Sequence, residues 1–65
     1  MTTMLEYFKM ILKKVSFDSY LFEKELRKSI SRLIGVEKEQ LKTWCYQNFA
    51  PRFRLILDRN FNRLA

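Results

Sequence analysis

The sequence predicts an all-α fold: a compact bundle of three to four short helices in a single small domain spanning residues 1–65. Apolar residues recur at intervals of three and four along most of the chain, which is the spacing of one helix face. With one glycine and one proline, the chain has few residues for the turns of a many-stranded sheet. Hydrophobic residues make up 48% of the chain and aromatic residues 15%, which favours folding of a domain near the lower size limit.

The first helix is expected over about residues 3–15, with Thr2 or Thr3 as its cap. One face of this segment is apolar and consists of Met4, Leu5, Phe8, Ile11, Leu12 and Val15. We expect this face to pack on the protein core. A basic amphipathic helix lying on a membrane surface is the alternative interpretation.

The second helix is expected over about residues 19–34. Asp18 is a strong N-cap candidate, and Phe17 and Phe22 are spaced to form a hydrophobic staple around it. Its buried stripe is predicted to be Phe22, Leu26, Ile30, Leu33 and Ile34. Gly35 follows, and a glycine at this point can adopt the left-handed conformation that ends a helix.

A third helix is expected over about residues 37–49, with carboxylates in its first turn where they favour the helix dipole. Its predicted buried residues are Leu41, Trp44, Cys45 and Phe49. Pro51 then interrupts the helix. A fourth helix is expected over about residues 52–63, begun by Pro51 at its first position, with a buried face of Phe53, Leu57, Phe61 and Leu64.

The composition restricts the class of function. Thirteen basic and seven acidic residues give a net charge of +6, which favours nucleic acid, anionic lipid headgroups or acidic proteins as partners. The single cysteine indicates a reducing compartment, and no apolar run approaches the length of a membrane span, so we predict a cytoplasmic protein. The chain has no histidine, glycine-rich loop or paired carboxylates. We therefore expect no enzymatic activity, metal, cofactor or small-molecule ligand.

Apolar, small and glycine residues follow a defined order around Gly35: Ile30, Ser31, Ile34, Gly35, Val36, Leu41 and Trp44. With this order, residues 27–46 resemble the helix-turn-helix family of DNA-binding domains. The resemblance implies that the helix after Gly35 enters the major groove with its N-terminal part. The residues facing the groove would then be Glu37, Lys38, Glu39, Lys42 and Thr43. Plain helical hairpins share the same apolar layout, so both interpretations remain open.

Two further segments, residues 13–30 and 43–49, are similar to a group of short bacterial proteins of unknown function. This resemblance implies no activity, ligand or partner. It supports treating the chain as one complete small protein.

The prediction that requires least of the sequence is a protein–protein interaction or adaptor domain, or a self-associating one, with Tyr7, Tyr20 and Tyr46 as candidate anchors. Nucleic-acid binding is the alternative. It would use Lys38, Lys42 and Thr43, or a C-terminal arginine set interleaved with Phe53 and Phe61. That set is Arg52, Arg54, Arg59 and Arg63. An exposed groove lined by aromatic residues would favour the protein partner, and a large uncancelled basic patch would favour nucleic acid.

Overall fold

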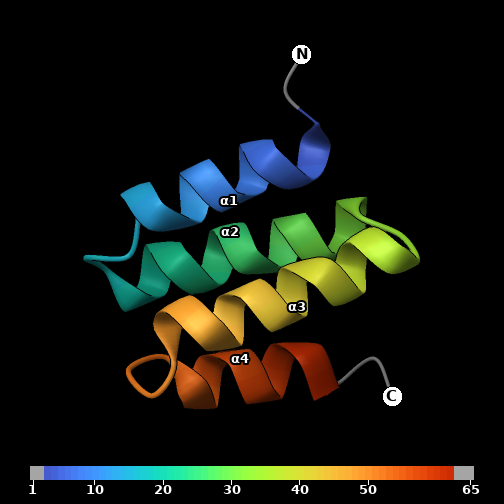
Figure 1. Cartoon of the computed structure of the whole chain (residues 1–65). Helices are drawn as coiled ribbons and strands as arrows, with labels where there is room; N and C mark the ends of the chain where they lie inside the picture. Colours follow the sequence, from blue (N-terminus) through green and yellow to red (C-terminus); the bar gives the residue numbers. More distant parts are fainter. Residues whose placement is uncertain (1–2, 63–65) are drawn as a thin grey trace.

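A computed structural model describes residues 3–62 of the chain, and within them it contains four helices and no strand. The helices are α1 (Met4–Lys14), α2 (Ser19–Arg32), α3 (Val36–Phe49) and α4 (Arg54–Phe61). Successive helices run in opposite directions (Figure 1). The predicted all-α class and the four predicted helices are confirmed.

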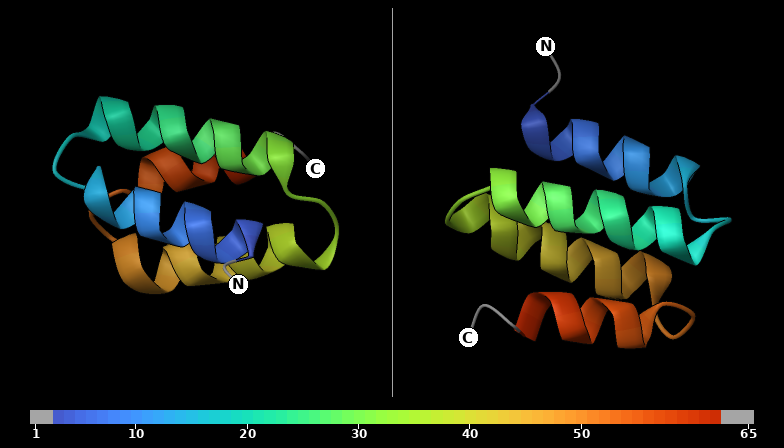
Figure 2. Two further views of the ribbon diagram at one scale, coloured as in Figure 1. Left: turned by 90° about the horizontal axis from the view of Figure 1, so that it is seen from above. Right: turned by 180° about the vertical axis from the view of Figure 1, so that it is seen from behind.

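The helices are arranged so that α1 and α4 each pack against both α2 and α3. Although α2 and α3 are consecutive in the sequence, they lie at opposite corners of the bundle (Figure 2). The short link between them therefore crosses the end of the bundle. As a result α1 lies beside α3, and these two helices run in the same direction (Figure 1).

The core contains apolar side chains from all four helices. At its centre the ring of Phe22 stacks on Phe53 with 4.4 Å between centroids and meets Phe49 edge-on at 4.9 Å. Such pairs stabilise the core beyond their buried area. The buried apolar residues are Leu5, Phe8, Leu12, Phe22, Leu26, Ile30, Leu33, Leu41, Cys45, Phe53, Leu57 and Phe61. Most of the predicted apolar faces of α2 and α4 is thus confirmed, and half of the residues predicted to be buried on α1 and on α3 are buried.

The start of α1 and the start of α2 are both capped as predicted, but the apolar residues near them are more exposed than expected. The Thr3 hydroxyl accepts a hydrogen bond from the Glu6 amide at 3.1 Å. The Asp18 carboxylate accepts from the amides of residues 20 and 21. Met4 and Phe17 nevertheless face solvent, so the predicted staple between Phe17 and the buried Phe22 is wrong. The Asp18 carboxylate caps the amides of residues 20 and 21 without the staple.

The end of α2 differs from the prediction. The helix stops at Arg32 because Leu33 takes an extended conformation, with φ −86° and ψ 148°. The chain then turns outward, and Ile34 is 77% exposed rather than part of the buried stripe. Gly35 has the expected positive φ of 59°, but it precedes α3 as its N-cap instead of ending α2 directly.

The start of α4 is also later than predicted. Residues 50–53 form a turn after α3, in which the Ala50–Pro51 peptide bond is cis. The Pro51 carbonyl accepts from the Arg54 amide at 3.2 Å, so Pro51 lies before the helix and not at its first position. The predicted burial of Leu64 lies outside the described residues, whereas the buried Asn60 was not predicted.

Candidate functional site

The outer face of α3 is unusually poor in charge. Five of its residues face away from the core on adjoining turns, and they are Val36, Glu39, Gln40, Thr43 and Gln47. Only Glu39 is charged, although charged residues make up 31% of the chain. Val36 at its first turn is 70% exposed. This face combines uncharged hydrogen-bonding groups with apolar surface.

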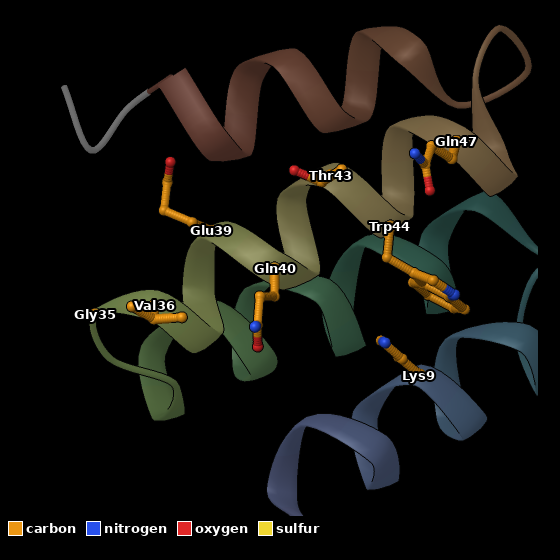
Figure 3. A pocket seen from close by; sticks show the side chains of 8 residues that line it. All are labelled: Lys9, Gly35, Val36, Glu39, Gln40, Thr43, Trp44 and Gln47. Carbon is orange, nitrogen blue, oxygen red and sulfur yellow. The ribbon is translucent and has the colours of Figure 1, made fainter.

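A groove of about 700 Å³ lies along this face, between α3 and α1. Its lining includes the five α3 residues, Gly35 at one end, and Lys9 of α1. Trp44 forms its aromatic part. Figure 3 shows the side chains of Lys9 and Trp44 pointing toward one another from the two helices.

Trp44 is fixed in place but remains half-exposed. Its ring meets Phe49 edge-on at 5.3 Å, with an interplanar angle of 80°, and Phe49 packs against the core. Trp44 was predicted to be buried; it lies instead at the margin of the core, because its helix places it toward α1 rather than toward the bundle centre. A rigid, partly exposed indole is a typical anchor for a partner's side chain.

Two lysines of α1 bring positive charge to the Trp44 part of the groove, where Glu6 is the one acidic residue in the same hollow. The Nζ atoms of Lys9 and Lys13 lie 5.7 and 5.9 Å from the centroid of the indole ring, within cation–π distance. Lys9 is 4.0 Å from Glu6, and Lys13 forms no ion pair with another residue of the range 3–62. The exposed Met10 adjoins them in a smaller hollow of about 300 Å³.

The residues predicted to contact DNA from α3 have different environments. Thr43 is exposed and lines the groove, and the half-buried Lys42 lines an adjoining hollow of about 490 Å³ together with Thr43. Lys38 is half-buried and lines neither. Helix-turn-helix units join two helices at roughly 90–120° through a short turn. Here α2 and α3 run in opposite directions at opposite corners of the bundle (Figures 1 and 2).

The three described arginines of the C-terminal segment each contact another side chain of the protein. Arg59 pairs with Glu23 at 2.6 Å, Arg54 lies 3.8 Å from Asp58, and Arg52 lies over the Phe53 ring at 4.8 Å. The rings of Phe53 and Phe61 are buried in the core, where a nucleic-acid base cannot stack on them. Arg63 lies outside the described residues.

Cys45 and Tyr46 follow Trp44 in the sequence, and the pKa values of both side chains are raised. Burial raises the pKa of the Cys45 thiol to about 12, so the thiol stays protonated at neutral pH and is a poor nucleophile. Burial, followed by its hydrogen bond to Asp58, raises the pKa of Tyr46 to about 12. Tyr46 therefore links α3 to α4, while Tyr7 and Tyr20 remain exposed.

Residues 3–62 contain no cluster of three histidine, cysteine, aspartate or glutamate side chains that could hold a metal ion. None of the described helices combines the length and the apolar character needed to cross a bilayer.

Sequence reasoning missed the contribution of Lys9, Lys13 and Met10 to the groove. Periodicity placed Lys9 and Lys13 mostly on the side of the first helix opposite its apolar face, without indicating which other helix would lie beside them, and it did not place Met10. A usable signal was present in α3, where positions 36, 39, 40, 43 and 47 share one face and carry a single charge. Charge depletion of this kind marks interface centres.

Comparisons with protein-family models, with curated proteins and with solved structures found no significant match to this chain.

Proposed function

We propose that this chain is a protein–protein interaction module that binds its partner through the groove between α1 and α3. The observation that carries the proposal is the half-exposed Trp44, held against Phe49 beside the charge-poor face of α3. Tryptophan is among the residues most enriched at binding hot spots, and interface centres are depleted in charge.

The chemistry of the face fits a protein partner better than a nucleic acid. Gln40, Thr43 and Gln47 offer donors and acceptors that suit peptide groups and polar side chains. Lys9 is the single basic residue among those that line the groove, whereas phosphate contacts supply most of the affinity in nucleic-acid binding. Both walls of the groove also belong to helices that are already packed in the bundle, so little conformational entropy is lost on binding.

Nucleic-acid binding is the alternative function, and the net charge of +6 favours it. It would use Lys38, Lys42 and Thr43 of α3, which the sequence predicts as nucleic-acid contacts, or the C-terminal arginines. The two functions predict different chemical partners at Thr43, which is exposed and belongs to both candidate surfaces.

Site-specific photocrosslinking in the cells that produce the protein tests the proposal. A benzophenone amino acid replaces Thr43 in one variant and Ser31 in the control, since both are small, polar, exposed residues of helices. We expect a discrete protein adduct from position 43 that Trp44→Ala removes, and none from position 31. A nuclease-sensitive adduct, equal labelling at both positions, or no adduct would each contradict the proposal.

A further inference from the structure

We infer that the occupant of the groove is an acidic amphipathic helix of another protein, with an apolar residue on Trp44 and carboxylates on Lys9 and Lys13. This inference rests on the proposed function and names the chemistry of its partner. It follows from the shape of the groove, from the position of its charges and from the charge of the whole chain.

The shape suits a short helix. The lining residues of α3 extend from Val36 to Gln47, a rise of roughly 16 Å along the helix axis, which about three turns of a partner helix would span. Apolar surface is available along this length from Val36, Trp44 and the adjoining Met10. A helix laid in a groove uses apolar residues three and four apart as its anchors.

The charges specify the partner's polar residues. Lys9 and Lys13 are four residues apart on α1, so their stems are neighbours on one helix face. Both ammonium groups lie over Trp44, and the Lys9 contact with Glu6, at 4.0 Å, is long. Two carboxylates spaced four residues apart on a partner helix would match this pair. A leucine or phenylalanine between them would reach the indole ring.

The opposite end of the groove defines the orientation. Glu39 lines the groove near Gly35, at the N-terminal end of α3, so an acidic residue there would be repelled. The carboxylates of the partner therefore belong at the Trp44 end, and uncharged or basic residues belong at the Glu39 end.

The charge of the whole chain favours an acidic partner over a second copy. Two chains of net charge +6 repel each other, and a second copy would place another set of basic helices against Lys9 and Lys13. A partner with excess carboxylates is instead attracted over long range and associates faster.

Two synthetic helical peptides with the same apolar residues and no tryptophan or tyrosine test this inference. One carries glutamates four residues apart beside its apolar anchor, and the other carries lysines there. Trp44 is the only tryptophan of the chain, so its emission reports directly on the groove. We expect the acidic peptide to shift the emission and to bind about tenfold more tightly at low salt, with the advantage shrinking as salt screens the charges. Equal affinities, or tighter binding of the basic peptide, would overturn the inference.

Two double variants with the same net charge distinguish pairing of the peptide with Lys9 and Lys13 from attraction by the overall charge of the protein. Lys9→Gln with Lys13→Gln removes the two groove charges, while Lys24→Gln with Lys28→Gln removes two exposed charges from α2. We expect only the first pair to abolish the preference for the acidic peptide; an equal loss in both would refute the local pairing. If photocrosslinking at Thr43 gives a protein adduct but the two peptides bind equally, this inference alone is contradicted. If Thr43 gives no protein adduct, the proposed function is contradicted as well.

Discussion

Glu23 on α2 accepts two hydrogen bonds from the guanidinium group of Arg59 on α4, each 2.6 Å long. The buried Asn60 donates to the same carboxylate at 2.8 Å and accepts a hydrogen bond from Arg27 at 3.1 Å. This network joins two neighbouring helices that are far apart in the sequence. It also engages Arg59 within the protein, which leaves this arginine less available to a phosphate group.

The pairing predicts a specific acid sensitivity. The hydrogen bonds from Arg59, and then that from Asn60, lower the pKa of Glu23 from 4.5 to about 2. Between these values the unfolded chain binds the proton and the folded chain does not, so the free energy of unfolding falls as pH decreases from 4.5 to 2. We expect a loss of about 1–2 kcal/mol after allowing for solvent screening, measurable by urea unfolding across this range.

Glu23→Gln should remove this part of the acid sensitivity and lower the stability at pH 7. Glu25→Gln is the matched control, because Glu25 lies on the same helix and its carboxylate makes only a 3.9 Å contact with Lys28. The control should keep the wild-type pH dependence between 4.5 and 2. Identical pH profiles for the wild-type protein and Glu23→Gln would contradict the assignment.

Two leucines of α4 provide a test of the core. Leu57 is fully buried, and Leu55, two residues earlier, is 79% exposed. Leu57→Ala should reduce the free energy of unfolding by about 2–5 kcal/mol, a large part of the total for a domain of this size. Leu55→Ala should change it by no more than about 0.5 kcal/mol. Thermal unfolding followed by circular dichroism checks both, and equal effects would contradict the orientation of α4.

The sequence was sufficient to predict the four helices and most of the core, because the apolar spacing at Phe22, Leu26 and Ile30 is a local property of the chain. It was not sufficient to predict which helices are neighbours. The approach of α1 to α3, which brings Lys9 to Trp44, depends on the link around Gly35 crossing the end of the bundle. Ile34 was misassigned for a different reason: a periodic pattern does not reveal where the chain leaves the helix, and α2 ends at Arg32.

Within residues 3–62, Gly35 is the one position where the backbone itself requires glycine. Its φ of 59° and ψ of −129° are unfavourable for an L-residue but are the mirror image of an ordinary extended conformation. Apart from Gly35 and its two chain neighbours, no atom lies within 4 Å of the position that an added Cβ would occupy. Gly35→Ala should therefore destabilise the fold by about 1–3 kcal/mol through backbone strain alone.

Chemical synthesis with D-alanine at position 35 provides the control for this prediction. D-Alanine adds the same methyl group but favours positive φ, so we expect it to retain or increase the wild-type stability. Urea unfolding of the three proteins measures the difference. Equal destabilisation by L- and D-alanine would mean that the methyl group itself, and not the backbone, is responsible.

An amide chemical-shift titration with duplex DNA and with single-stranded RNA addresses the nucleic-acid alternative. If the groove is a protein-binding site, we expect only small shifts spread over the exposed lysines at low salt, and these should vanish near physiological salt through counterion release. Shifts that persist at Lys38, Lys42 and Thr43 would instead support the helix-turn-helix interpretation. Persistent shifts at Arg52, Arg54 and Arg59 would require Arg59 to exchange its carboxylate partner for a phosphate. In that case the added nucleic acid should also raise the pKa of Glu23 toward 4.5, because the carboxylate would lose the hydrogen bonds from Arg59 that lower this pKa.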